Sequence, residues 1–381
     1  MKKRMITLLL TAALGSSMVL AGCAGSQNTG SDKAGADTKA ADTSSVADTS
    51  SESDAAEVKE VPAQTITLTT TYSETEYAGD LIKYFGNQLS ELSGGAITLD
   101  VYWGGTVAAT GEELSFVGSG GMDMSVIGQS MYTDTLSLLN FPSQVLGGYE
   151  DSVKLIDYIA FENETTSPLI QDEIESNNVH MIGSLPGGSN AFITAKEYTS
   201  LDEMKGLKIG IGMNQSAMEM LGLNVVTMMP WDYYDQLSRG MADAGYMSVT
   251  GLISMSLQEV MPYFLKDGTY TAGNLMTVNL DKWNSFDDNT KAVFEEAMEA
   301  TQAYSYTTAS SMDDDSIAAI EAQGGALNVL SEEDAAKVQE AFFTTGVSDA
   351  RTYAETSGKA DDMEVILQEV ADYIGLEVPA K

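Results

Sequence analysis

The only cysteine of the 381-residue chain, Cys23, has the most distinctive chemical context. It ends the stretch Leu-Ala-Gly-Cys, which resembles the lipobox in which a bacterial cysteine is acylated and becomes the mature N-terminus. Residues 2–4 are basic, and residues 5–20 are apolar but too short and interrupted for a membrane span. We expect residues 1–23 to be a lipoprotein signal peptide. The alternative is an ordinary signal peptide with a chance cysteine.

The single histidine, His180, lies in a run that predicts a buried strand, and we interpret it as a core residue rather than a base. One histidine and one cysteine exclude disulfide frameworks, zinc fingers and redox cysteine pairs. The hydrolase motif Gly-x-Ser-x-Gly and the metalloprotease motif His-Glu-x-x-His are absent. Gly210-x-Gly212 lacks the third glycine of a dinucleotide site, and residues 313–315 lack the spacing of a calcium loop. We therefore expect no catalytic residue, no cofactor and no metal.

The formal net charge is −37, from 19 lysines and arginines against 56 aspartates and glutamates. Such acidity excludes nucleic acid as a partner, because nucleic-acid binding needs a basic surface. Most of the charge lies after residue 62 and therefore belongs to the folded part of the chain. We interpret it as a device for solubility, since salt screens long-range steering of charged ligands beyond ~8 Å.

Residues 24–62 consist largely of Ala, Ser, Thr, Gly and Asp and contain no aromatic residue. Such a segment cannot bury enough apolar surface to offset the entropy lost on ordering. We expect a disordered tether that reaches about 35 Å as a random coil. Together with a lipid on Cys23, it would hold an extracytoplasmic protein at the outer face of the cell membrane, with ~0.8 kcal/mol gained for each buried CH₂ group.

The globular part begins with alternating strand and helix patterns. A Ser-x-x-Glu capping box at residues 73–76 predicts the start of the first helix. We predict strands at 65–70, 97–103, 122–127 and 179–185, with helices at 73–92, 112–118 and 151–161 between them. This order implies a mainly parallel, doubly wound sheet.

A second unit follows the same order, and the C-terminal region is helical. A second capping box at residues 200–203 predicts a short turn of helix. We predict strands at 192–194, 207–212, 225–229 and 244–248, helices at 215–221 and 232–241, and a strand at 275–280 that returns to the first sheet. We predict a long amphipathic helix at 290–306 that continues, with or without a bend, to 321, and further helices at 332–344 and 363–374.

These patterns predict an α/β fold with two lobes, a hinged cleft between them and a long helix that spans both. Lobe I would cover residues 63–187 and be completed by about 275–315. Lobe II would cover residues 188–274 and be completed by about 316–381. Ligands of such sheets bind outside the carboxyl ends of the strands, which places the expected site in the cleft.

Five stretches of sequence carry a family resemblance. They are "LSELSGGAITLDVYWGGTV" (89–107), "GEELSFVGSGGMDMSVIG" (111–128), "SLDEMKGLKIGI" (200–211), "YYDQLSRGMADAGY" (233–246) and "NLDKWNSFDDNTKAVFEEA" (279–297). Together, residues 64–300 resemble the solute-binding proteins of tripartite ATP-independent periplasmic (TRAP) transporters of the dicarboxylate type. The resemblance implies a periplasmic-binding-protein-like fold that captures a small organic solute and delivers it to the membrane subunits of a TRAP permease. It implies no catalysis.

The chain departs from this family where a carboxylate is usually held. Asn190 stands where a bidentate arginine is typical, Gly210 where a second arginine is common, and Met247 where an asparagine is usual. Loss of such a clamp would cost an anion about 2–5 kcal/mol. Three interpretations remain open. The solute is neutral or zwitterionic, backbone N–H groups near Gly210 and Gly212 hold an anion, or Lys196 or Arg239 enters the cleft.

The candidate ligand-binding residues are aromatic and amide-rich and lie mainly at predicted strand ends. They are Tyr72, Trp103, Glu112, Gln129, Asn190, Gly210, Met213, Asn214, Trp231, Tyr234, Tyr246, Met247 and Asn274. The sequence thus predicts a monomeric, lipid-anchored receptor for a small organic acid or related compound. Two alternatives are a ligand-sensing surface lipoprotein that serves a signalling partner and a surface hydrolase, which the single histidine disfavours.

Overall fold

The computed structural model describes residues 58–381, apart from the side chains at positions 230, 312 and 313. The predicted signal peptide, Cys23 and most of the predicted tether lie outside the described residues. Among the described helices, none has both the length and the hydrophobicity that a membrane crossing needs.

The described chain forms a ten-stranded sheet in the order β2-β1-β3-β9-β5-β8-β6-β7, with β4 and β10 also pairing with β9. The strands are β1 (Gln64–Thr70), β2 (Ile97–Tyr102), β3 (Met124–Gly128), β4 (Gln144–Leu146), β5 (Val179–Thr194), β6 (Lys208–Ile211), β7 (Asn224–Thr227), β8 (Ala244–Ser248), β9 (Tyr263–Asn279) and β10 (Ala326–Val329). Strands β1, β2 and β3 pair in parallel at one end, and β6, β7 and β8 do so at the other.

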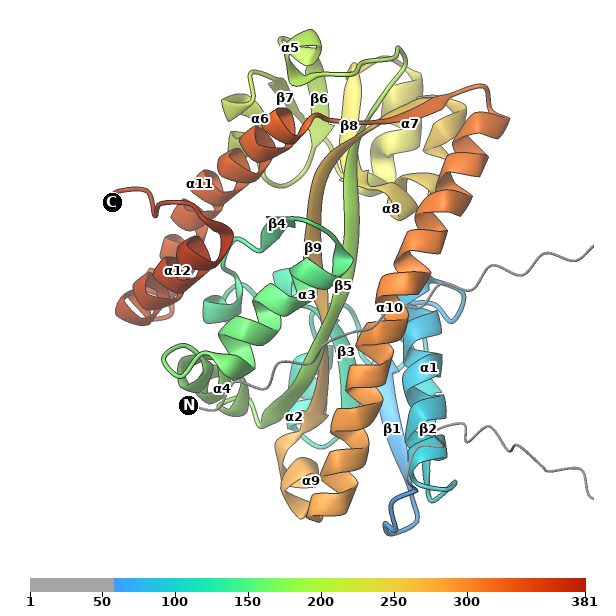
Figure 1. Cartoon of the computed structure of the whole chain (residues 1–381), viewed down its shortest axis with the longest axis vertical. Helices are drawn as coiled ribbons and strands as arrows, with labels where there is room; N and C mark the ends of the chain where they lie inside the picture. Colours follow the sequence, from blue (N-terminus) through green and yellow to red (C-terminus); the bar gives the residue numbers. More distant parts are fainter. Residues whose placement is uncertain (1–57) are drawn as a thin grey trace, which may run out of the picture. The chain divides into compact units, whose positions relative to one another are not determined.

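Two long antiparallel strands, β5 and β9, run through both halves of the sheet (Figure 1). The sequence predicted two separate strands at 179–185 and 192–194, and this prediction was wrong because one 16-residue strand covers both. The predicted strand at 275–280 covers only the last five residues of the 17-residue β9. The strand is nevertheless irregular between the two predicted segments. The register of pairing with β9 shifts on both sides of Pro186, which has no N–H to donate.

Helices cover both faces of the sheet. They are α1 (Tyr77–Leu92), α2 (Glu113–Gly118), α3 (Tyr149–Asp157), α4 (Ser167–Glu175), α5 (Leu201–Met204), α6 (Gln215–Met220), α7 (Tyr233–Ser238), α8 (Val249–Ser254), α9 (Leu280–Ser285), α10 (Asp288–Ala322), α11 (Glu332–Thr356) and α12 (Ala360–Ile374). A π-helical turn, Tyr158–Glu162, follows α3 directly.

The two predicted capping boxes have different outcomes. Ser200 accepts a hydrogen bond from the backbone N–H of Glu203, so the second box caps α5 as expected. At the first box, the Glu76 carboxylate accepts from the N–H of Ser73 at 3.2 Å, but the Ser73 hydroxyl caps no helix. Helix α1 therefore begins at Tyr77, and the predicted start at residue 73 was wrong.

The 35-residue helix α10 extends about 52 Å and links the two halves (Figure 1). Near its start it packs on α1, where Tyr304 stacks on Tyr84 with ring centroids 4.0 Å apart and Phe294 meets Phe85. Near its end Ile320 joins the core of the other half, beneath α8. This confirms the prediction of a two-lobe α/β fold with a long helix that spans both lobes.

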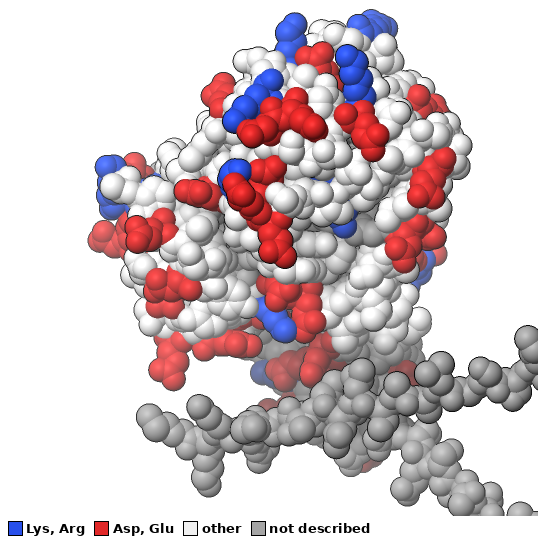
Figure 2. All heavy atoms as spheres, turned by 45° about the horizontal axis from the view of Figure 1, so that its top comes forward, with Lys and Arg blue, Asp and Glu red and all other residues white. Residues whose placement is uncertain are grey.

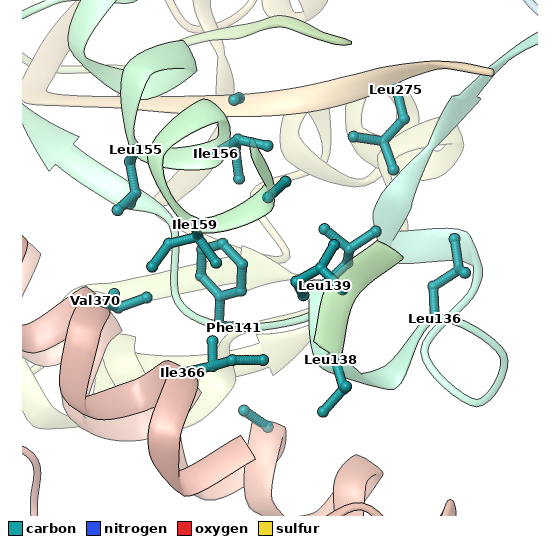
Figure 3. Packing of buried hydrophobic residues seen from close by; sticks show 14 of the residues in the cluster. Leu136, Leu138, Leu139, Phe141, Leu155, Ile156, Ile159, Leu275, Ile366 and Val370 are labelled. Carbon is teal, nitrogen blue, oxygen red and sulfur yellow. The ribbon is translucent and has the colours of Figure 1, made fainter. Parts of the chain in front are cut away.

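A large apolar cluster attaches α3, α4, α11 and α12 to the first half of the sheet. In Figure 3, Ile366 and Val370 of α12 lie beside Phe141 and Ile159, and all four side chains are buried. Truncating a buried isoleucine to alanine typically costs about 2–5 kcal/mol. This packing therefore fixes α11 beside the loop that contains Phe141, and both form walls of the cavity described below.

Acidic side chains are spread over the face shown in Figure 2, with fewer lysines and arginines among them. Many basic side chains lie beside an acid on the surface, as in the pairs Lys205–Asp202 at 2.6 Å and Arg239–Asp235 at 2.7 Å. Both pairs are well exposed, so each contributes little to stability.

Candidate ligand-binding site

A cavity of about 330 Å³ lies where β5 and β9 cross between the two halves of the sheet. Three groups of residues line it. The first half supplies Gln129, Ser130, Thr133, Asn140, Phe141, Pro142, Ser143, Gln144, Thr271, Ala272 and Gly273; the second supplies Asn190, Met213, Asn214 and Tyr246; and α11 supplies Phe342, Gly346, Asp349 and Tyr353.

Five of the predicted ligand-binding residues line this cavity. Gln129 comes directly after β3, whereas Tyr246, predicted at a strand end, is the central residue of β8. Met213 and Asn214 follow β6, and Asn214 adopts a left-handed conformation with φ of 56° that asparagine tolerates well. Asn190 lies inside the last third of β5 rather than at a strand end.

Tyr72 and Asn274 come together, but one layer behind the cavity wall. The Tyr72 hydroxyl donates to Oδ1 of Asn274, whose Nδ2 donates to the carbonyl of Pro186 at 3.4 Å. Burial raises the pKa of Tyr72 to about 12. The pair joins the end of β1 to the interrupted centre of β5 and β9, directly beneath Gly273 of the cavity wall.

Five other predicted residues lie away from the cavity. Trp103 packs against the core of the first half, and Met247 packs in the core of the second. Glu112 is exposed before α2, whereas the buried carboxylate there belongs to its neighbour. Trp231 is 78% exposed, and Tyr234 is exposed with its hydroxyl donating to Glu259 at 2.9 Å.

Gly210, the thirteenth predicted residue, is packed against a methionine. A Cβ atom at this position would lie 2.6 Å from the sulfur of Met228, which is itself buried. No larger side chain fits without displacing Met228. The family resemblance leads one to expect a second arginine at position 210. The structure instead has a glycine there, packed against an apolar side chain.

The two arginines of the described chain are both engaged elsewhere. Arg239 pairs with Asp235 on the surface. Arg351 donates to both carboxylate oxygens of Glu364, at 2.8 and 3.0 Å, and to the carbonyl of Pro379 at 2.9 Å. Lys196 is exposed and does not line the cavity.

A buried hydrogen-bond chain stands behind the cavity wall. Oδ1 of Asp267 accepts from the N–H of Thr269 at 2.8 Å and from its hydroxyl at 2.9 Å, and Oδ2 accepts from the Tyr246 hydroxyl. Burial raises the pKa of Asp267 to about 6 despite these donors, and burial also raises the pKa of Tyr246. Asp267 is therefore ionised at neutral pH.

Sequence reasoning missed the wall that α11 provides. The predicted helix ended at residue 344, whereas α11 continues to Thr356 and places Asp349 and Tyr353 at the cavity. One signal was present, because Gly346 is a helix-weakening residue inside the pattern. A glycine is needed at position 346 because the helix backbone lies close to another part of the cavity wall. A Cβ atom there would lie 3.0 Å from Cγ of Pro142.

His180 is distant from the cavity wall and only half-buried, so its predicted place in the core holds in part. Its ring stacks on Trp283 with centroids 4.6 Å apart, and Nδ1 lies 3.3 Å from the Glu175 carboxylate. Burial lowers the pKa of His180, and Glu175 opposes this change. The contacts are those of a packing residue.

The sequence model of bacterial extracellular solute-binding protein family 7 matches residues 68–345, which is most of the chain. The chain belongs to this family. Membership of a solute-binding family agrees with the expectation of a binding protein rather than a hydrolase. A curated relative named as a solute-binding protein, from Albidiferax ferrireducens, is 23% identical over 195 residues. The match covers 50% of this chain and 56% of that protein, so it extends over about half of the relative's length.

Solved structures of TRAP solute-binding proteins share the fold. A TRAP periplasmic solute-binding protein from Ochrobactrum anthropi is similar with a TM-score of 0.67 at 18% identity, covering 83% of this chain and 97% of that one. One from Desulfovibrio salexigens, described as an open complex, gives 0.65 at 18% identity, with 83% and 98% covered. A marine metagenome protein solved with pyroglutamate gives 0.61 at 15% identity, with 82% and 99% covered.

Proposed function

We propose that this protein is the extracytoplasmic receptor of a TRAP-type secondary transporter, and that it captures a small organic solute and delivers it to the membrane permease. The observation that carries the proposal is the cavity of about 330 Å³, because both halves of the sheet and α11 contribute to its walls. Its size is within the range of small-molecule sites. Similar proteins were solved with pyroglutamate and with β-D-galacturonate, which are solutes of this scale.

A site built from two lobes couples binding to closure. A solute that contacts Gln129 on one side and Asn190 on the other makes more contacts when the walls approach, so it favours the closed arrangement. We assign lobe I to residues 63–187 with about 275–315, and lobe II to 188–274 with about 316–381. The strands β5 and β9 then form the connection about which the lobes move.

We further propose that a lipid on Cys23 and the tether at 24–62 hold the receptor at the outer face of the cell membrane. The support is the sequence alone, namely the Leu-Ala-Gly-Cys stretch and the composition that follows it. The test is expression of Cys23→Ala in a bacterial host with metabolic labelling by a palmitate analogue. The wild type should be labelled and sediment with membranes, whereas unlabelled wild-type protein would contradict the anchor.

The function itself is tested by thermal unfolding with a panel of carboxylates, sulfonates, amino acids, sugars and neutral ring compounds. A true solute should raise the midpoint in proportion to the logarithm of its concentration, because it binds only the folded state. Deletion of the gene should then abolish uptake of that compound. No shift with any class, together with unchanged uptake after deletion, would contradict a receptor function.

A further inference from the structure

The cavity wall carries no positive side chain among the described residues. Of its nineteen lining residues, the single ionisable group that is charged at neutral pH is Asp349, exposed at the mouth on α11. Arg239 and Arg351 are paired elsewhere, and Asp267 adds a second negative charge behind Tyr246. Lys266 acts on Asp267 with an opposite charge but does not line the cavity. An anionic solute would therefore meet one carboxylate and no cation in the cavity wall.

The buried chain behind the wall also fixes the direction of its hydrogen bonds. Tyr246 gives its only hydroxyl proton to Asp267, so its oxygen can only accept from Nε2 of Gln144, at 3.4 Å. The Gln144 amide is thereby oriented, and its Oε1 is buried without a donor. Through Tyr246 alone, the carboxylate of Asp267 thus orients Gln144, whose Oε1 is left as an unsatisfied acceptor in the cavity wall.

Gln129 supplies a second acceptor on the same side. The residue is 7% exposed, lines the cavity, and its Oε1 is also buried without a donor. A buried acceptor without a donor is costly, and a ligand that supplies the donor recovers that free energy. Both oxygens therefore need O–H or N–H groups, which a carboxylate cannot provide.

We propose that the cavity selects a solute that carries no net negative charge and presents several hydroxyl, amide N–H or ammonium donors. Gln129 and Gln144 accept from these donors, and Asp349 favours a positive or donor group at the mouth. This inference rests on the proposed function and gives its solute class. It distinguishes this chain from relatives solved with galacturonate, glucuronate or pyroglutamate.

The test is calorimetric titration of the full chain in detergent with probes that share a skeleton and differ in charge. One series is D-galactose, D-galactosamine and D-galacturonate, and another is pyroglutamate with its uncharged carboxamide. Parallel series use amino acids with their amides and neutral ring compounds with their carboxylates. In each series that binds, the uncharged or cationic member should bind at least about tenfold more tightly than the acid.

Two variants report on the named residues with a matched control. Gln144→Leu should weaken every bound probe about tenfold, because it removes an acceptor and leaves the donor unpaired. Asp349→Asn should weaken the amine two- to fivefold and leave the neutral sugar nearly unchanged, as expected of an exposed charge pair. Glu355→Gln removes the same charge from the same helix away from the cavity, and should change neither.

Tighter binding of the acid than of its uncharged partner would overturn this inference while leaving the receptor function intact. Equal weakening of acid and amine by Asp349→Asn would overturn the role of that carboxylate. An absence of binding across all series would count against both the inference and the receptor function.

Discussion

Asp157, which is half-buried, and Asp267, which is fully buried, are two carboxylates with similar pKa values and different surroundings. Burial raises the pKa of each to about 6. Asp157 accepts from Gln302 of α10 at 3.0 Å and from Ser184 of β5 at 3.3 Å, so it joins a helix to the sheet. Asp267 accepts from Tyr246 and stands behind the cavity. Asp157 thus connects two structural elements, whereas Asp267 orients, through Tyr246, an amide that lines the cavity.

The largest expected effect is on the pH dependence of stability. Both groups have a folded pKa of about 6 against 3.8 in the reference state, so the folded protein holds these protons more tightly. The protonated form of each group therefore stabilises the folded state. This contribution to the free energy of unfolding is complete below pH 3.8 and is lost as the pH rises through about 6, and the loss is about 3 kcal/mol per group. Asp157→Asn and Asp267→Asn should each remove their own share of this decrease in the free energy of unfolding with pH, relative to wild type.

Urea unfolding between pH 3.5 and 7 measures this slope, and exposed Asp372→Asn on α12 is the control. If the Asp157→Asn and Asp267→Asn variants both retained the wild-type slope, neither carboxyl group would have the raised pKa on which this prediction depends.

The next effect comes from removing one donor to each carboxylate. Gln302→Leu deletes the 3.0 Å bond to Asp157, and Thr269→Val deletes the 2.9 Å hydroxyl bond to Asp267. Each leaves a buried charge with fewer partners, so each should lower the free energy of unfolding by about 1–3 kcal/mol at pH 7. The loss should shrink at pH 4.5, where the carboxyl is protonated. A loss independent of pH would indicate a packing effect alone.

A smaller effect separates the two groups by function. Asp267→Asn allows the introduced amide to donate to Tyr246, which no longer fixes Gln144 as an acceptor toward the cavity. The affinity for a bound solute should fall about tenfold, or ~1.4 kcal/mol, by calorimetry. Asp157→Asn should leave that affinity unchanged. Equal effects of the two substitutions would remove the distinction between a packing carboxylate and an orienting one.

The smallest expected effect concerns Trp231, which was a candidate stacking residue in the sequence. It is 78% exposed and does not line the cavity, so Trp231→Ala should leave affinity unchanged and alter stability by less than about 0.5 kcal/mol. A tenfold loss of affinity would mean that Trp231 joins the site in another arrangement of the lobes.

The sequence predicted those helices and strands that depend on neighbouring residues, such as capping side chains and apolar periodicity. The cap of α5 at Ser200 and the long helix α10 follow from short-range side-chain chemistry and periodicity. The full length of β5 was not predicted, because Pro186 and the two glycines after it are residues typical of turns, whereas pairing with β9 continues the strand through them.

The site divides in the same way. Gln129, Met213 and Asn214 could be predicted because strand ends share one edge of a sheet. Asp349 could not be, because its place depends on how α12 and the loop at Phe141 hold α11. Asp267 was equally hidden, since its pairing with Tyr246 joins residues twenty-one positions apart on different strands.

The break at Pro186 in the β5–β9 ladder has a mechanical consequence. Its partner on β9 is Ala272, which lines the cavity with Thr271 and Gly273. The point where the pairing of β5 and β9 is interrupted is therefore also part of the wall of the proposed solute site. A bound solute would contact both strands here and restrict their local motion. Backbone amide protons of residues 271–273 should therefore exchange more slowly when solute is bound.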